Sequence, residues 1–93
     1  MSELELIILS AREALELNKT EEALAILCQL SVANHAEVIF LKGEIYYKLQ
    51  RWGDALNQFT SFLELFPSDK KAESYCLMIQ NILGFFHKDF YNP

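Results

Sequence analysis

Hydrophobic residues recur along this chain at spacings of three and four positions, which is typical of helices that bury one face. Polar and charged residues fill the positions between them; in the first stretch these are mainly glutamates. Five stretches have this pattern: residues 2–17, 20–30, 36–49, 52–65 and 70–88. The sequence therefore predicts an all-α protein with five helices.

Short polar breaks separate the predicted helices and contain residues that favour helix ends. Asn18 and Asn34 each precede a glutamate by three positions. This is the spacing of a capping box, so we expect them to cap the second and third helices. Pro67 cannot continue the fourth helix, and Ser68 or Asp69 is expected to cap the fifth.

The clearest pattern lies in residues 36–67, where two helices are expected to fold back on each other around a turn at residues 50–54. Their apolar residues keep helical spacing: Ile39, Phe40, Tyr46, Tyr47 and Leu49 in the first helix, and Ala55, Leu56, Phe59, Phe62, Leu63 and Phe66 in the second. Gly43 lies within the first helix, where glycine costs about 1 kcal/mol relative to alanine. We therefore expect Gly43 to allow the close approach of a neighbouring helix, with the small Ala55 opposite it.

This stretch resembles a tetratricopeptide repeat, a helix-turn-helix unit of about 34 residues with a signature at fixed spacing. The residues that match the signature are Gly43, Tyr46, Ala55, Phe59 and Pro67. Two residues depart from it: Lys42 stands where leucine is usual, and Phe62 stands where a small residue is usual. Either Leu41 and Ile45 take over part of the packing, or the unit sits at a slightly changed angle.

A more degenerate copy of the pattern precedes this unit. Equivalent residues lie 32 positions apart: Ala11 and Gly43, Ala14 and Tyr46, Ala23 and Ala55, and Leu27 and Phe59. The resemblance implies a right-handed α-α superhelix in one tetratricopeptide-repeat domain over residues 1–93. Its parts would be unit one at about 4–35, unit two at about 36–69, a capping helix at about 70–88 and a short tail at 89–93. A capping helix covers the last exposed face of a repeat array.

Members of this family bind other proteins on a concave wall built from the first helix of each unit. The resemblance implies a partner-binding set on this wall: Ile8, Arg12, Leu15, Phe40, Glu44, Tyr47, Lys48 and Leu77. The apolar members would anchor a peptide or helix of the partner, and the charged members would orient it. Alternatively, Phe40 and Tyr47 complete the core or are covered by the fifth helix.

Some members of the family clamp the carboxylate of chaperone tails with lysine and asparagine on the same wall. The corresponding positions here are Ile8, Arg12, Phe40 and Glu44. Arg12 and Lys48 alone do not make such a clamp, so we do not predict binding of chaperone tails.

The C-terminal part of the chain indicates a second function. The apolar fraction is 52%, above the usual range of about 45–50%, and several aromatic residues fall near the end of the chain. The residues expected to take part in self-association are Met78, Phe85, Phe86 and Phe90. They would form a homodimer, or dock on a larger protein, through the fifth helix. Alternatively, the tail folds back over the fourth helix.

The charge of the chain excludes some classes of partner. The net charge is −5, whereas proteins that bind nucleic acid or acidic membranes usually present a basic surface. The first residues are acidic where a signal peptide would be basic, and the apolar run at residues 6–9 is too short to span a bilayer. We expect a cytoplasmic protein that binds neither nucleic acid nor membrane.

No group of residues in the sequence has the spacing of a catalytic or metal site. Cys28 and Cys76 lack CxxC spacing, and we expect both to be buried, reduced thiols. His35 and His87 are far apart and are expected at a loop and a helix end. The sequence therefore predicts a noncatalytic protein without cofactor or metal, whose function is to bind another protein or peptide.

Overall fold

The computed structural model describes residues 2–30 and 35–86, and every regular element in this part of the chain is a helix. The five helices are α1 (Glu3–Glu16), α2 (Thr20–Cys28), α3 (Ala36–Lys48), α4 (Trp52–Leu65) and α5 (Lys70–Phe86). The prediction of an all-α chain with five helices is confirmed. Helix α2 ends two residues earlier than predicted. The predicted end of the fifth helix, at residues 87–88, lies outside the described residues.

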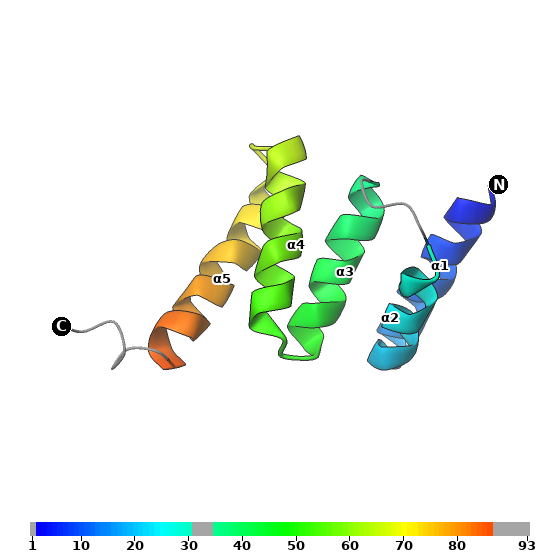
Figure 1. Cartoon of the computed structure of the whole chain (residues 1–93), viewed down its shortest axis with the longest axis horizontal. Helices are drawn as coiled ribbons and strands as arrows, with labels where there is room; N and C mark the ends of the chain where they lie inside the picture. The colour runs from blue at the N-terminus through cyan, green and yellow to red at the C-terminus, as the bar shows by residue number, and fades with distance from the viewer. Residues whose placement is uncertain (1, 31–34, 87–93) are drawn as a thin grey trace.

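The helices form a row in which each packs mainly on its neighbours in sequence: α1 on α2, α2 on α3, α3 on α4 and α4 on α5. Figure 1 shows this row, with the α1–α2 pair at one end and α5 at the other. The starts of α1, α3 and α5 lie at the same end of the helices as the end of α4. Each helix is too narrow to bury its apolar face alone, and stacking on the next helix covers it.

The turns after α1 and α3 have the same backbone conformation. Each contains one residue in the left-handed region, Asn18 at φ 63° and Gln50 at φ 61°. The hydrogen bonds that close the two turns also correspond: Lys19 N–H to the Ala14 carbonyl and Arg51 N–H to the Tyr46 carbonyl, both 2.9 Å. This is the Schellman arrangement, in which a residue with positive φ ends the helix. Equivalent atoms of the two turns lie 32 positions apart, which is the interval between the matched residues in the sequence.

The helix caps differ from the predictions at two positions. The N-cap of α3 is His35, which makes no side-chain cap hydrogen bond, instead of the predicted Asn34. Asn18 does not form a capping box, because it adopts the left-handed conformation that ends α1; Lys19 is the N-cap of α2 and makes no side-chain cap hydrogen bond. Asp69 does cap α5, since its carboxylate accepts a hydrogen bond of 2.8 Å from the Ala72 N–H. Asn34 lies outside the described residues.

The core consists of two clusters on opposite sides of α3. The first unites α1 and α2 with one face of α3, and its buried residues are Ile8, Ala11, Ala14, Leu15, Ala23, Leu27, Val38, Leu41 and Ile45. The second unites α4 and α5, and its buried residues are Ala55, Phe59, Ala72, Cys76 and Ile79. The other face of α3 packs on this second cluster through Phe40, Tyr46 and Tyr47. The apolar face predicted for this helix did not include Val38, and it named Leu41 and Ile45 only as an alternative. All three pack toward α1 and α2, because α3 is covered on both sides.

The two cysteines lie in different environments. Cys76 is buried as predicted, and burial raises the pKa of its thiol. The prediction that Cys28 is buried is wrong: it is exposed, because α2 turns Ala23 and Leu27 toward the core and ends at Cys28. Among the described helices, none combines the length and apolar character needed to cross a membrane.

Candidate protein-binding groove

The predicted partner-binding residues do not form one open wall. Ile8 and Leu15 are core residues, only 5% and 9% exposed, between α1, α2 and α3. Little of the surface of these two side chains is therefore free to anchor a partner.

Phe40 and Tyr47 are half-buried and contact α5, as the alternative interpretation had it. The Phe40 ring lies edge-on to the rings of Phe59, Phe62 and Tyr75, with centroids 5.2, 5.0 and 6.0 Å away. Tyr47 lies edge-on to Tyr75 at 5.1 Å. Such edge-to-face pairs add to the stability gained by burial alone. Most of the surface of these two residues is therefore used within the chain.

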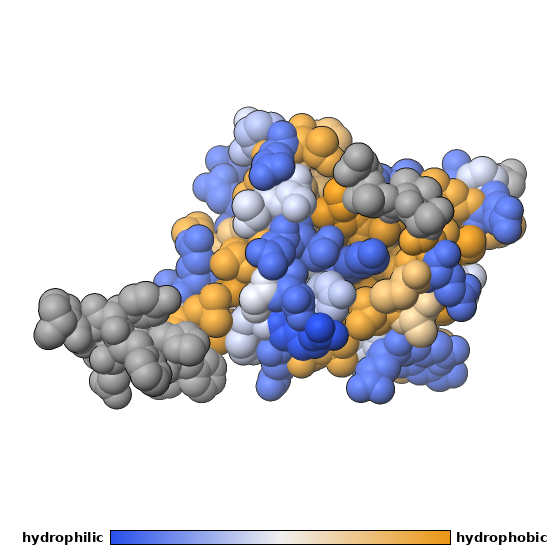
Figure 2. All heavy atoms as spheres, in the orientation of Figure 1, coloured by the Kyte–Doolittle hydropathy of each residue, from blue (hydrophilic) through white to orange (hydrophobic). Residues whose placement is uncertain are grey.

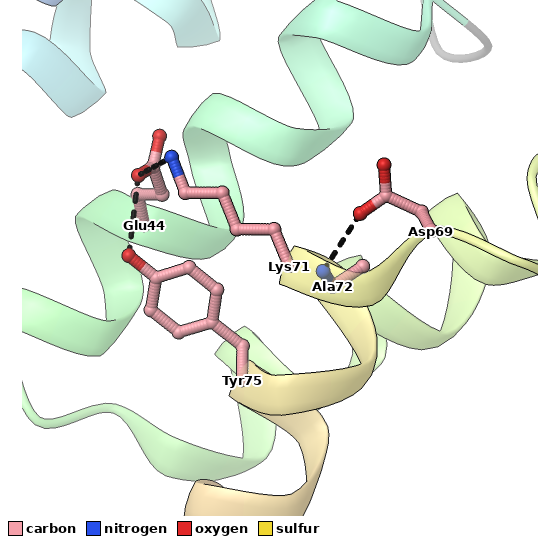
Figure 3. Close-up of polar contacts among 5 residues, drawn as sticks. All are labelled: Glu44, Asp69, Lys71, Ala72 and Tyr75. Carbon is pink, nitrogen blue, oxygen red and sulfur yellow. Dashed lines mark hydrogen bonds and ion pairs between the residues drawn. The ribbon is translucent and has the colours of Figure 1, made fainter.

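Glu44 is also engaged by α5. Its Oε2 accepts a hydrogen bond of 3.2 Å from the Tyr75 hydroxyl, and Lys71 Nζ lies 3.8 Å from the same oxygen (Figure 3). Burial is the larger cause, and the adjacent Glu44 carboxylate the next, of a pKa of Tyr75 raised to about 12. Both disfavour the negatively charged tyrosinate. The arrangement joins α3 to α5 through side chains.

Lys48 holds α3 against the end of α1. Its Nζ donates to the Leu15 carbonyl at 3.5 Å and to the Asn18 Oδ1 at 3.2 Å. A cation is favourable there, since the last carbonyls of a helix carry partial negative charge. Of the predicted charged residues, only Arg12 forms neither a hydrogen bond nor an ion pair with another described side chain.

Arg12 lines a hollow with a volume of about 540 Å³. The hollow lies between α1, the start of α3 and the end of α4, and it is lined by Arg12, His35, Ala36, Glu37, Phe40, Phe62, Phe66 and Asp69. Phenylalanine rings form much of its wall, and Phe66 is 49% exposed. Figure 2 shows apolar atoms at the surface where α4 ends. The hollow is thus an apolar depression with charged groups around it.

A second hollow of about 280 Å³ continues the first along α1. It is lined by Glu5, Ile8, Leu9, Arg12, His35 and Glu37. Arg12, His35 and Glu37 line both hollows, so the two lie side by side, and together they are named here the α1–α4 groove. It runs from the first turns of α1 across the start of α3 to the end of α4.

The α1–α4 groove carries three carboxylates and one guanidinium. Glu5, Glu37 and Arg12 are exposed, and Asp69 is half-buried. Within residues 2–30 and 35–86, none of the four forms an ion pair. Asp69 uses one carboxylate oxygen to cap α5. The local charge of the groove is therefore negative.

His35 is the N-cap of α3 and borders both hollows. Its Nδ1 is buried and has no hydrogen-bond partner among the described residues. A neutral imidazole has one nitrogen that donates and one that accepts. His35 therefore adds a polar group at the centre of the groove.

Several groove residues were not predicted as site residues, among them His35, Phe62, Phe66 and Asp69. Phe62 had a signal in the sequence, because it departs from the repeat pattern with a large residue where a small one is usual. Phe66 was assigned to the apolar face of α4, but it is the C-cap and half-exposed. Its position depends on how the chain turns from α4 into α5.

The exposed face of α5 also carries large apolar side chains. Leu77 is 55% exposed and Met78 is 42% exposed, as expected for residues away from the stripe that packs on α4. The side chains of Phe85 and Phe86, and all of Phe90, lie outside the described part of the chain. Met78 Sδ also lies 3.9 Å from the Tyr47 hydroxyl.

In the described ranges, no group of three or more histidine, cysteine, aspartate or glutamate residues is placed to hold a metal ion. No protein-family model matches the chain, and neither does any curated protein or solved structure. The groove and the α5 face are therefore interpreted from their geometry and chemistry.

Proposed function

We propose that this chain is a noncatalytic protein-binding module of the tetratricopeptide-repeat type, and that it holds a segment of another protein in the α1–α4 groove. The repeat assignment rests on the signature residues of α3 and α4 and on the two turns that correspond at an interval of 32 positions. Arrays of this kind leave extended surfaces between stacked helices, where a partner segment contacts several units at once.

The observation that carries the proposal is the continuity of the groove. Its larger hollow, at about 540 Å³, lies within the range of roughly 300–1,000 Å³ found for ligand sites. It shares three lining residues with the second hollow along α1, and two adjoining hollows suit an elongated ligand better than a compact one. Protein interfaces commonly have an apolar centre, which supplies much of the affinity, and a charged rim, which orients the partner. The α1–α4 groove has the same division.

Selection from a random peptide library displayed on phage tests the proposal, using the whole chain as bait. The selected peptides are then measured on two matched variants, Phe66→Ser and Leu77→Ser. Both remove a half-exposed apolar side chain, but only Phe66 lines the groove. We expect Phe66→Ser to weaken binding at least tenfold and Leu77→Ser to leave it within twofold.

Two results would overturn this assignment. The first is a library that returns no specific peptide. The second is a set of peptides whose affinity is unchanged by Phe66→Ser while the variant keeps the helical circular-dichroism spectrum of the parent. Peptides that are lost with Leu77→Ser would place the binding surface on α5.

A second candidate function is self-association through α5, favoured by the adjacent exposed side chains of Leu77 and Met78. An array that ends in a helix with an apolar outer face gains stability when another helix covers it. Light scattering over a concentration series measures this directly. A mass that stays monomeric at the highest concentration excludes it, and a dimer abolished by Leu77→Ser supports it.

A further inference from the structure

Resting on the proposed function, we infer that the α1–α4 groove selects a segment with one large aromatic residue flanked on both sides by lysine or arginine. A repeat architecture alone does not specify which side chains a bound segment carries. The preference follows from the order of apolar and charged groups along the groove.

The larger hollow is built for a large, flat side chain. Phe40, Phe62 and Phe66 face it from α3 and from the end of α4. The centroids of the Phe40 and Phe62 rings are 5.0 Å apart, and those of Phe62 and Phe66 are 5.1 Å apart. An inserted aromatic ring can add edge-to-face contacts of the same kind, and aromatic anchors in such pockets supply much of the affinity of protein interfaces.

Acidic groups lie at both ends of the groove. Asp69 borders the larger hollow at the start of α5, and Glu5 borders the smaller one on α1. Glu37 lies between them and lines both hollows. A segment whose aromatic residue fills the larger hollow therefore has a carboxylate on either side of it. Lysine or arginine at the flanking positions would pair with carboxylates that form no ion pair within the described chain, although Asp69 also caps α5.

Arg12 is the one cation of the groove and lies near Glu37 in the shared part of both hollows. It leaves a local excess of negative charge, three carboxylates against one guanidinium. Its guanidinium donates hydrogen bonds but accepts none, so a peptide carbonyl is a suitable partner for it. The net charge of −5 for the whole chain adds a long-range attraction for a basic segment.

Rim charges of this kind mainly govern specificity and association rate, and salt screens them. The inference therefore predicts binding that depends on both the aromatic residue and the salt concentration. A partner recognised by apolar contacts alone would show the first dependence without the second.

The test uses three acetylated and amidated peptides of equal length and isothermal titration calorimetry on the whole chain. The first peptide has a central tryptophan between two pairs of lysines; the second replaces the lysines with glutamates; the third replaces the tryptophan with alanine. We expect the first to bind at least tenfold more tightly than either of the others. Its affinity is expected to fall several-fold between about 50 and about 300 mM salt.

Charge variants locate the site. The double variant with Glu5→Gln and Glu37→Gln removes two exposed groove carboxylates, and we expect it to weaken binding of the lysine peptide about fivefold or more. The matched control, Glu16→Gln with Glu22→Gln, changes the net charge equally but removes exposed carboxylates outside the groove. It is expected to change the affinity less than twofold.

Equal binding of the lysine and glutamate peptides would overturn the inference, as would equal loss in the two double variants. Selection from the peptide library distinguishes failure of this inference from failure of the proposed function. Groove-dependent peptides that lack an aromatic residue or basic flanks contradict this inference and leave the proposed function standing. Failure of the library and of all three peptides contradicts both.

Discussion

The ring of Phe59 lies directly over Gly43, so close that α3 has no room for a side chain at this position. A Cβ atom on Gly43 would be 2.7 Å from Cζ and 2.8 Å from Cε1 of Phe59. Both residues are buried, and Phe59 stacks on Tyr75 with ring centroids 4.4 Å apart and planes 5° from parallel. The predicted close approach at Gly43 is confirmed, but its partner is an aromatic ring rather than the small Ala55.

We predict that Gly43→Ala destabilises the chain by about 1–3 kcal/mol, the usual cost of overpacking a core. The gain of about 1 kcal/mol in helix propensity does not offset it, because Phe59 is held between Gly43 and Tyr75 and cannot move away. Urea unfolding followed by circular dichroism measures the change. Gly53→Ala in α4 is the control: it meets nothing within 4 Å, and its stability should equal or exceed that of the parent. A Gly43→Ala variant as stable as the parent would show that the core can rearrange.

The two left-handed residues at the ends of α1 and α3 should respond differently to glycine. Gln50 has no local reason to adopt a positive φ, whereas asparagine tolerates this conformation, and Asn18 also accepts a hydrogen bond from Lys48. We predict that Gln50→Gly stabilises the chain by about 0.5–1 kcal/mol and that Asn18→Gly gives no gain. Thermal unfolding of the two variants beside the parent gives the comparison. Equal effects at the two positions would contradict it.

Tyr75 should make stability depend on alkaline pH. Its pKa in the folded chain is about 12, against an ordinary value of about 10, so the folded state retains a proton that the unfolded state has lost. The stabilising contribution is therefore complete below about pH 10 and is lost as the pH rises from about 10 to about 12.

This dependence can be separated from that of other groups by Tyr75→Phe, which keeps the ring but cannot ionise. We expect the parent to lose stability more steeply than the variant above about pH 10, in urea unfolding at a series of pH values. Ultraviolet titration of tyrosinate should also show that the variant lacks an ionisation near pH 12 that the parent has. Parallel stability curves would contradict the role of Tyr75.

The two thiols should react at very different rates. Cys28 is exposed and accessible to a thiol reagent such as dithionitrobenzoate, whereas Cys76 is buried and its raised pKa leaves less thiolate. We predict that one thiol per chain reacts rapidly with the reagent in the folded state, and that the second reacts only after unfolding. Cys28→Ser should remove the fast equivalent, and two fast equivalents in the parent would place Cys76 at the surface.

Local sequence pattern was sufficient for the helices. The predicted bounds of the fourth helix agree with α4, and the turns after α1 and α3 repeat at the interval read from the small residues. Helix periodicity and helix ends depend on residues within a few positions of one another, so they can be predicted without knowing the fold. Asn18 shows the limit, since asparagine favours both an N-cap and a left-handed C-terminal position.

The candidate site was predicted only in part. Ile8, Arg12 and Phe40 were predicted and line the α1–α4 groove, although Ile8 is largely buried. Glu44 and Lys48 were predicted on the same wall but contact other helices. A helical face pattern says which residues share a side, but not which neighbouring helix covers that side. Phe66 and Asp69 enter the groove because the chain turns between α4 and α5, where there is no periodicity to interpret.

The sequence by itself determined the number of helices, their order and the repeat of small and aromatic positions, because these follow from spacing along one chain. Only the tertiary structure decided how α3 divides its two faces. Val38, Leu41 and Ile45 pack toward α1 and α2, whereas Phe40 and Tyr47 pack toward α4 and α5. A helix covered on both sides has apolar residues around most of its circumference, so its sequence does not show which face stays open. The groove arises where the stacked helices end and leave the rings of Phe62 and Phe66 incompletely covered.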